Sequence, residues 1–393
     1  MPDALLLTVL AAAVAIGWWL GRRERRMAHD PAPPTGLARD YFVGLNYLLN
    51  DQQDRAIETF VGALEVNSET IETHITLGNL FRSRGEADRA MKIHQNLLAR
   101  PSLSAAQGER VQLELARDFL TLGLLDRAER LLKGLLRDSQ DAPLRQAARR
   151  LLADLLEREG EWAAAFEVAN PQLVEEDEER RRAAAHWLCQ LAEEERANAS
   201  PTLARRHLKR ALNVDPRCVR ANLLLAALEH DTAHYRQAIT LLSRIPAQDP
   251  AFTPTMLEPL AYNYQLLDDA EGLTRHLHEL LERHPYTSVI ILLAETLRQR
   301  EGIEPAIALV SEQLNREASL GALDYLIDLY RQHSRGEALE QLALLKRHTA
   351  DLLGKLPRHR CRRCGFSGDR LHWQCPRCRS WGTTRPITGI EGE

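Results

Sequence analysis

The sequence predicts an almost wholly α-helical protein, a superhelical solenoid of helical hairpins that ends in a small metal-binding module. Two observations indicate the helices. Leu, Ala, Glu and Arg dominate the composition and only 5% of residues are aromatic, as is typical of long helical arrays. A pattern of small and large residues also returns after 34 positions, the period of the tetratricopeptide repeat (TPR). The third observation is a group of four cysteines near the C-terminus.

Length and charge set the broad class of protein. A chain of 393 residues is long enough for several domains or one extended array. The net charge of −4 gives no global attraction to nucleic acid, so we expect no nucleic-acid partner. The chain contains none of the Gly-rich phosphate loops, zinc-protease helices or nucleophile elbows of common enzymes. We therefore expect a protein that is not an enzyme.

Residues 1–21 are predicted to form a membrane anchor. No charged residue occurs from Ala4 to Leu20, a stretch near the short limit for a membrane-spanning helix, and Trp18-Trp19 suits the interface. The positive-inside rule places in the cytoplasm the arginines that follow, at Arg22, Arg23, Arg25 and Arg26. We expect an uncleaved single-pass anchor with the N-terminus outside; a signal peptide and a buried helix are the alternatives.

Residues 22–37 are predicted to form a basic, proline-containing linker on the cytoplasmic side. Its prolines, at positions 31, 33 and 34, remove backbone donors and clash with a preceding helical turn. We expect a short, stiff spacer between the membrane and the body of the protein.

Residues 38–356 are predicted to form about nine TPR-like hairpins. Gly44 and Tyr47 return 34 residues later as Gly78 and Phe81. In this repeat a small residue lies where the helices of a hairpin cross, and stacked hairpins leave a groove that binds peptides or proteins. The small residue of the first helix is expected at Ala116, Ala153, Ala192, Ala226, Ala261 and Ala294. That of the second helix is expected at Ala128, Ala165, Ala204, Ala238, Ala306 and Ala338.

Two features inside the array have plain structural explanations. The repeat register is uncertain between about residues 105 and 200, a stretch that holds the charged run 175–182. Acids and arginines four residues apart in this run predict ion pairs along a solvated helix face, rather than a dedicated docking site. Cys189 and Cys218 have no cysteine near them in the sequence, so we expect inert packing residues.

Residues 357–393 are predicted to form the metal-binding module, with the spacing C-x2-C-x10-C-x2-C at Cys361, Cys364, Cys375 and Cys378. Each C-x2-C pair directs two thiolates to one point, so two facing pairs supply a tetrahedral site for one Zn²⁺ or Fe ion. About 40 residues cannot bury enough apolar surface to fold unaided, so the metal must supply stability. A reducing cytoplasm keeps the thiols available for metal.

Neighbouring residues predict how the module is built. Backbone N–H groups after the first cysteine of each pair are expected to point at its sulfur. Gly365 permits the turn that follows the first pair, whereas Arg379 stands in the equivalent place, so we expect the second turn to differ. We expect three aromatic residues to cover the cluster and dock it on the last helices: Phe366, Trp373 and Trp381.

Four cysteine ligands do not distinguish Zn²⁺ from Fe. Zn²⁺ would make the module structural, and Fe would allow one-electron chemistry in the manner of rubredoxin. No flavin or nicotinamide fingerprint is present, which disfavours electron transfer. His372 is expected to be a packed or exposed histidine, not a ligand. Arginines beside the cysteines would suit a phosphate-like or acidic protein partner, or a nucleic-acid-binding ribbon.

The order of anchor, linker, TPR hairpins and tetracysteine tail resembles the lipopolysaccharide assembly protein B (LapB) family of Gram-negative inner-membrane proteins. The resemblance covers the whole chain. Its most specific residues are in the tail, from Cys361-Arg-Arg-Cys364-Gly365-Phe366 to Trp373-Gln-Cys375-Pro376-Arg-Cys378-Arg-Ser-Trp381, followed by Pro386-Ile387 and Gly389.

This resemblance implies a non-catalytic adaptor in the bacterial inner membrane, with its N-terminus in the periplasm and its body in the cytoplasm. The implied partners are the membrane AAA+ protease FtsH and the deacetylase LpxC, whose degradation restrains lipid A synthesis. A periplasm-facing inner-membrane regulator is a further implied partner. The sequence does not decide whether the protein forms a homo-oligomer. The competing interpretations are a membrane-tethered scaffold for lipopolysaccharide biosynthetic enzymes and an iron rubredoxin-type redox protein.

Overall fold

The computed structural model describes residues 71–101, 103–169, 174, 177–390 and 392, with a few isolated residues before them. The predicted anchor (1–21), linker (22–37) and first hairpin (38–70) therefore lie outside the described residues, apart from those few. Among the described residues, no helix combines the length and apolar character needed to cross a membrane. The chain divides into two compact units, Met1–Arg145 and Gln146–Glu393.

The described part of the first unit consists of packed helical hairpins. Helices α4 and α5, α5 and α6, and α6 and α7 pack against each other, and α4 also contacts α6. Apolar side chains between α4, α5 and α6 form the core, including Ile71, Ile75, Leu97 and Val111. The helices are α4 (Ile71–Ser83), α5 (Ala87–Leu98), α6 (Ala105–Thr121) and α7 (Leu125–Asp138), and α8 (Ala142–Glu159) begins in this unit and ends in the second.

A buried polar network sits where α4, α5 and α6 meet. His94 Nδ1 contacts the Asp118 carboxylate, and both side chains are completely buried. Arg82 Nη1 donates to Asp118 Oδ1 at 2.8 Å, which pairs the buried charge. The His94 ring fills the space above Gly78, where an added Cβ would lie 2.4 Å from Nε2. Gly78 is therefore the small residue that the repeat pattern requires at this crossing.

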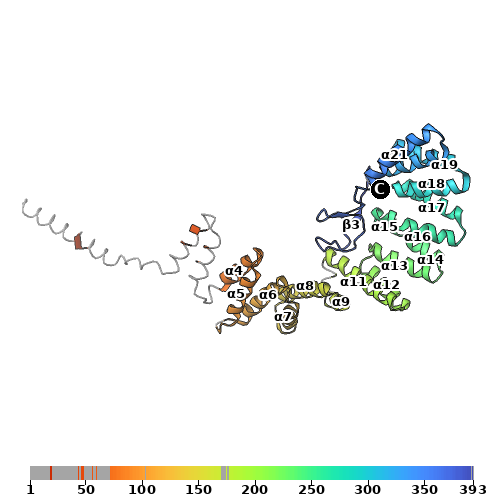
Figure 1. Cartoon of the computed structure of the whole chain (residues 1–393). Helices are drawn as coiled ribbons and strands as arrows, with labels where there is room; N and C mark the ends of the chain where they lie inside the picture. Colours follow the sequence, from red (N-terminus) through yellow and green to blue (C-terminus); the bar gives the residue numbers. More distant parts are fainter. Residues whose placement is uncertain are drawn as a thin grey trace, which may run out of the picture. The chain divides into compact units, whose positions relative to one another are not determined.

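The second unit continues the array and ends in a small sheet (Figure 1). Consecutive helices from α11 to α14 and from α16 to α21 pack against one another in a curved stack, in which the first helices α16, α18 and α20 also touch. The helices after α8 are α9 (Trp162–Ala169), α11 (Glu178–Ala197), α12 (Pro201–Val214), α13 (Val219–Asp231), α14 (Tyr235–Leu242), α15 (Ile245–Gln248), η1 (Pro250–Phe252), α16 (Thr253–Leu266), α17 (Ala270–Arg283), α18 (Thr287–Glu301), α19 (Ile303–Arg316), α20 (Leu320–His333) and α21 (Glu337–Leu353).

Burial confirms most of the predicted crossing positions. Five of the six alanines assigned to first helices and five of the six assigned to second helices are at most 3% exposed. Ala261 is only partly buried, and Ala338 is exposed. Ala338 lies on α21, which is followed by the sheet and not by another helix that could cover it. The same lack of a cover leaves Leu345 and Leu352 of α21 more than half exposed.

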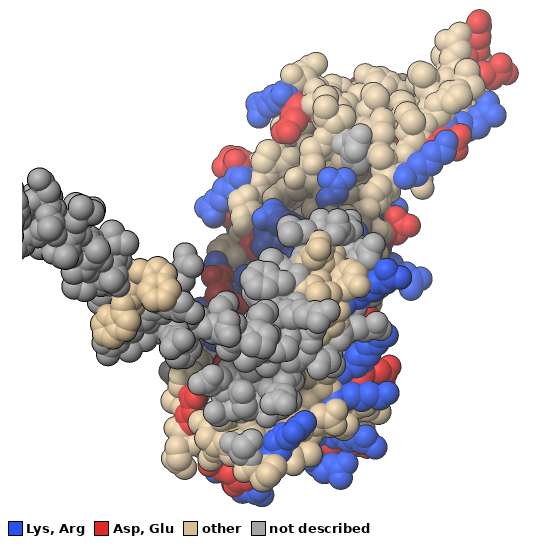
Figure 2. Space-filling model, turned by 90° about the vertical axis from the view of Figure 1, so that its left-hand side faces the viewer, with Lys and Arg blue, Asp and Glu red and all other residues tan. Residues whose placement is uncertain are grey.

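The C-terminal ribbon is a three-stranded antiparallel sheet in the order β2-β1-β3. Its strands are β1 (His359–Cys361), β2 (Ser367–Gly368) and β3 (Thr384–Pro386). In β1, Arg360 lies opposite Ser367 on one side and Arg385 on the other. Among the described residues visible in Figure 2, acidic and basic side chains both occur.

Candidate metal centre and its docking surface

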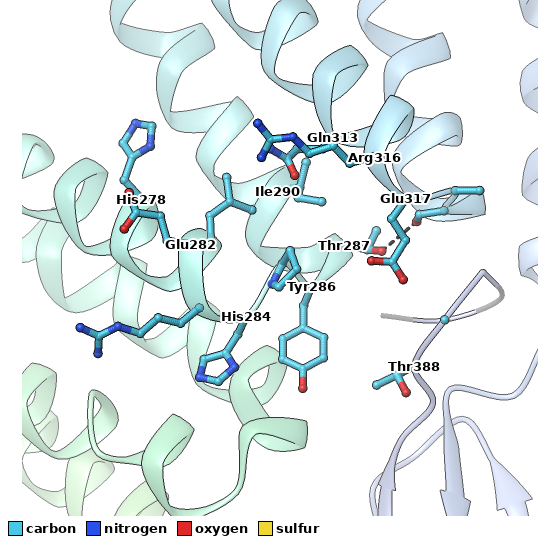
Figure 3. A pocket seen from close by; sticks show the side chains of 16 residues that line it. His278, Glu282, His284, Tyr286, Thr287, Ile290, Gln313, Arg316, Glu317 and Thr388 are labelled. Carbon is cyan, nitrogen blue, oxygen red and sulfur yellow. Dashed lines mark hydrogen bonds between the residues drawn. The ribbon is translucent and has the colours of Figure 1, made fainter.

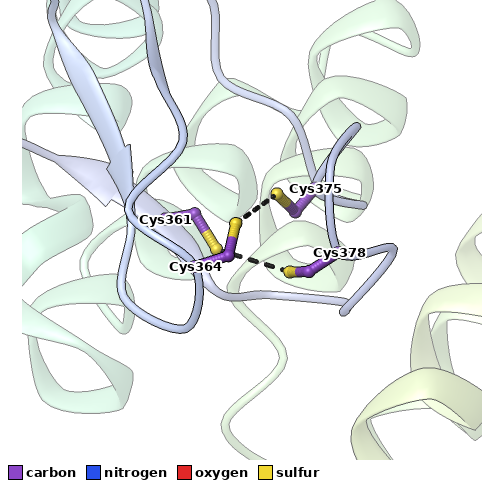
Figure 4. Close-up of side chains that lie close together, drawn as sticks. All are labelled: Cys361, Cys364, Cys375 and Cys378. Atoms are coloured by element: carbon purple, nitrogen blue, oxygen red, sulfur yellow. Dashed lines mark hydrogen bonds between the residues drawn. The ribbon is translucent and has the colours of Figure 1, made fainter. Parts of the chain in front are cut away.

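The ribbon brings the four predicted cysteines together. Their Sγ atoms all lie within 4.8 Å of one another (Figure 4). Cys361 and Cys378 are 3.7 Å apart, and Cys364 and Cys375 are 3.6 Å apart. A regular tetrahedron with Zn–S bonds of about 2.3 Å has S···S edges of about 3.8 Å. The sulfur atoms therefore fit one tetrahedrally bound ion, and His372 is not in the group.

The two cysteine knuckles have matching backbone hydrogen bonds, which corrects the expectation of different turns. Gly365 N donates to Cys361 O at 3.0 Å, and Arg379 N donates to Cys375 O at 2.8 Å. Gly365 has φ +74° and Arg379 has φ +57°, so both occupy the left-handed region. A non-glycine residue there costs roughly 1–2 kcal/mol, which the closed turn offsets at Arg379.

Backbone N–H groups point at the first sulfur of each knuckle, as predicted. Burial alone would raise the pKa of Cys361. Hydrogen bonds from Thr383 and from the N–H groups of Cys364 and Arg363 outweigh burial and lower its pKa to about 6. Because ligation requires thiolates, these donors favour the metal-binding form.

Cys375 shows the opposite balance. Burial raises its pKa to about 12, although the N–H groups of Cys378 and Arg377 lower it in part. The ion itself must supply the remaining stabilisation of this thiolate, so metal binding releases protons.

The ribbon docks on the middle of the chain, not on the last helices as predicted. Trp381 stacks on His186 of α11, with ring centroids 5.1 Å apart, and meets the edge of Trp162 of α9 at 6.0 Å. Trp373 stacks on Phe252 of η1 at 5.5 Å. Residues after the ribbon do reach the late helices, where Leu320 N donates to Ile390 O at 3.0 Å.

The third predicted aromatic residue stays within the ribbon. Phe366 meets the ring of His372 edge-on, at 6.1 Å between centroids. His372 is therefore a packed histidine, as predicted.

Glu157, near the end of α8, joins the ribbon to the solenoid. Its Oε2 accepts hydrogen bonds from the indole N–H of Trp381 at 3.0 Å and from that of Trp187 at 2.8 Å. Its Oε1 accepts from Gln374 Nε2 at 2.8 Å. One carboxylate thus accepts two donors from the ribbon and one from α11. No local pattern around Glu157 indicates this role, and the sequence reasoning missed it.

The charged run 175–182 has a docking role that the solvated-face interpretation overlooks. The predicted pair Glu178–Arg182 forms at 3.2 Å. The next residue, Glu179, pairs with Arg363 of the first knuckle. On the other side of the ribbon, Arg385 pairs with Asp249 at 2.7 Å. These ion pairs set the ribbon along the edge at which the first helices begin.

Gly382 permits the close approach of ribbon and helix. Its φ is +62°, and an added Cβ would lie 2.9 Å from Arg182 Cδ and 3.1 Å from His186 Nε2. Both the backbone conformation and the space therefore require glycine here.

Cys189 and Cys218 are buried as predicted, but they are partners. Their Sγ atoms lie 3.9 Å apart, between the middle of α11 and the start of α13. Burial first, and the nearby Cys218 thiol second, raise the pKa of Cys189 well above its usual value. The Cys189 thiol therefore stays protonated, and the two buried side chains pack as small apolar groups.

Two hollows lie on the surface of the helical array in the second unit. The first, of about 690 Å³, lies where α17 and α19 end and α18 and α20 begin (Figure 3). Within it, Thr287 Oγ1 and Ser319 Oγ lie 2.8 Å apart. A second, of about 780 Å³, is bounded by α16, α18, α20 and the chain that leads into the ribbon. Sequence periodicity predicts that a groove exists but cannot place these hollows.

The fold and the site define a class: a TPR solenoid protein that carries a rubredoxin-type metal ribbon on its edge. Two protein-family models match the chain, Rubredoxin metal binding domain over residues 359–386 and Tetratricopeptide repeat over residues 195–255.

Relatives named Lipopolysaccharide assembly protein B, from Escherichia coli (strain K12) and Haemophilus influenzae, are each 33% identical to this chain. The alignments cover 99% and 98% of this chain and 99% of each relative. The chain belongs to the lipopolysaccharide assembly protein B family. A solved TPR protein from Parabacteroides merdae shares 15% identity at a TM-score of 0.34, covering 72% of this chain and 99% of that one, a likeness too weak to carry an argument.

Proposed function

We propose that this protein is a non-catalytic adaptor in lipopolysaccharide assembly. The observation that carries the proposal is family membership across 99% of the chain, with relatives that bear this name. The architecture supports it, because stacked TPR hairpins bind other proteins and seldom perform chemistry. The four-sulfur ribbon supplies a metal-stabilised surface next to them.

The finer proposal concerns how the adaptor acts. Residues 1–21 would anchor it in the inner membrane beside the protease FtsH, and the cytoplasmic body would hold the deacetylase LpxC. Holding both partners at one patch of membrane raises their effective concentration to about the mM range without new chemistry. Faster degradation of LpxC would then restrain lipid A synthesis. A periplasm-facing regulator would act on the anchor.

The hollow beside α16, α18 and α20 is the surface we assign to a protein partner. Apolar side chains contribute to its wall, among them Pro254, Ile291 and Leu353, and Asp324 adds a charge. Its volume of about 780 Å³ suits several side chains of a bound segment. The ribbon docks beside this hollow and narrows it, since Pro386 and Ile387 also line it.

The test measures the half-life of LpxC in cells that carry this protein as their sole copy. Ile291→Arg places a charge in the hollow and is expected to lengthen the half-life several-fold. Arg347→Gln, at an exposed position of α21, is the matched control and should leave it unchanged. If cells that lack this protein degrade LpxC at the same rate as cells that contain it, the proteolytic role is excluded.

A scaffold that gathers biosynthetic enzymes is the second candidate, and the word assembly in the relatives' name favours it. Crosslinking followed by purification separates the two: a protease dominates under the first proposal and biosynthetic enzymes under the second. The four sulfur ligands also admit iron. A red ferric protein would support the redox alternative, whereas a zinc form is colourless.

A further inference from the structure

A third, smaller cavity lies under the ribbon and shares no lining residue with the hollow assigned to a protein partner. Its volume is about 260 Å³. The solenoid contributes Arg182 and His186 from α11, Arg217 from the turn before α13, and Gln248 from α15. The ribbon closes it with Arg385 of β3. The cavity therefore exists only while the ribbon is docked.

Three polar atoms of these lining residues are buried without a hydrogen-bond partner. They are His186 Nδ1, Gln248 Oε1 and Arg385 Nε. The His186 side chain is among the most buried polar groups of the protein, at 3% exposure. Buried polar atoms are almost always paired in folded proteins, so three unpaired atoms at one cavity indicate that a polar molecule completes it. Arg385 Nε needs an acceptor, His186 Nδ1 can donate to one, and Gln248 Oε1 needs a donor, such as the hydroxyl of a protonated phosphate or a water.

The charges around the cavity point to an anion. Arg182 and Arg217 share one carboxylate, Glu178, at 3.2 and 2.5 Å. Arg385 has its own partner, Asp249, at 2.7 Å. Two guanidinium groups on one carboxylate leave N–H donors to spare, because each guanidinium carries five.

The other arginines nearby act on the charge of Arg385. Burial lowers the pKa of Arg385, Asp249 raises it, and the positive charges of Arg362, Arg182 and Arg217 lower it again. Three arginines, Arg182, Arg217 and Arg385, line the cavity together with two carboxylates, Asp215 and Asp249. Their unused N–H donors, and not a net charge, are what an anion would accept from, since Glu178 outside the lining balances the third arginine.

We propose that this cavity binds a phosphate group, held between Arg182 and Arg217 of the solenoid and Arg385 of the ribbon. A tetrahedral oxyanion accepts from guanidinium groups that approach from different directions, which a planar carboxylate does less well. The volume lies below the roughly 300–1,000 Å³ of pockets for drug-sized ligands. A single phosphate group therefore fits, either free or as the head of a phosphomonoester or lipid.

Such a ligand would connect the ribbon to the solenoid. Since it touches residues of both, it binds the docked form and not the undocked one, and mass action then favours docking. The test uses the full-length, metal-loaded protein in detergent, and measures phosphate binding by phosphorus NMR and the thermal midpoint at constant ionic strength. We expect millimolar phosphate to raise the midpoint by about 2–4 °C.

The variant Arg217→Gln tests the site, because this side chain is 67% exposed and its loss leaves the fold intact. It should weaken phosphate binding roughly tenfold, in line with one charged hydrogen bond. Arg347→Gln is the control and should behave as the wild type, including the general stabilisation that phosphate gives any protein by exclusion. Metal content should be equal in all three proteins.

Three probes distinguish the sources of the phosphate group: inorganic phosphate, glycerol 3-phosphate and short-chain phosphatidylglycerol compared with phosphatidylcholine. An effect of the first two identifies a soluble ligand. An effect of phosphatidylglycerol alone identifies a lipid headgroup. If all three probes act equally on the wild type and on Arg217→Gln, the cavity holds water only and the proposal is wrong.

Discussion

Replacing Glu157 with glutamine should release the ribbon from the solenoid without unfolding it. The carboxylate accepts three N–H donors, two of them from the ribbon residues Trp381 and Gln374. A glutamine side chain has one acceptor oxygen, and its NH₂ group would face at least one of these donors. The Glu157→Gln variant therefore loses hydrogen bonds and gains a repulsive contact at the docking surface.

The size of the effect follows from the bonds lost. A hydrogen bond to a charged group contributes about 1.5–3 kcal/mol, and a buried donor left unpaired costs about 1–3 kcal/mol. With two ribbon donors affected, docking should weaken by about 2–4 kcal/mol, or roughly 30- to 700-fold. The third donor, Trp187, is fully buried, so the solenoid should also lose some thermal stability.

Trypsin gives the assay, because Lys355 and Arg358 are exposed in the segment that leads into the ribbon. Faster cleavage there, with a shift in tryptophan emission, should accompany full retention of the metal. Glu161→Gln, an exposed position before α9, is the matched control. Cleavage and emission equal to the wild type in Glu157→Gln would refute the docking role of this carboxylate.

Three further predictions test other parts of the structure. Gly78→Ala puts a methyl group 2.4 Å from His94 Nε2 and should cost about 1–3 kcal/mol in thermal unfolding, whereas Gly108→Ala, with nothing within 4 Å, should cost nothing. Cys361→Ser should drop bound metal well below one ion per chain in a chelator competition; full retention would rule out the four-sulfur site. Burial holds the pKa of His186 well below 6.5, and Arg220 and Arg182 lower it further. Below pH 6.5 the His186 imidazole takes up a proton in the unfolded protein but stays neutral in the folded protein. Stability should therefore fall by about 1 kcal/mol between pH 6.5 and pH 5.5, and His186→Gln should flatten that pH dependence in a denaturant titration.

The solenoid could be predicted because its cause is local and repeated. Outside residues 105–200 the alanines at helix crossings recur at nearly the same spacing, so an error at one unit is corrected by the next. Ala261 and Ala338 are the exceptions. At Ala338 the reason is physical, because α21 ends the array and has no following helix to bury it.

The metal ligands could be predicted for a similar reason, since each cysteine pair lies within four residues. The docking surface could not be predicted, because its contacts join residues more than 100 positions apart, and Glu157 and Gln374 are 217 apart. At Arg379 the conformational preference of the residue type gives the wrong prediction. A left-handed backbone conformation is unfavourable for arginine, yet the hydrogen-bonded turn of the second knuckle imposes it.

The long span between Glu157 and its ribbon partners also has a consequence for biosynthesis. Glu157 leaves the ribosome 217 residues before Gln374 and 224 before Trp381. Chains fold from the N-terminus as they are made, so the aromatic edge at Trp162 and His186 stays exposed to water until the ribbon has been synthesised. A chain that stops before residue 357 would leave these aromatic side chains exposed, where chaperones or proteases that bind apolar surface would recognise them. Docking of the ribbon therefore distinguishes a chain that contains residues 357–393 from one that lacks them.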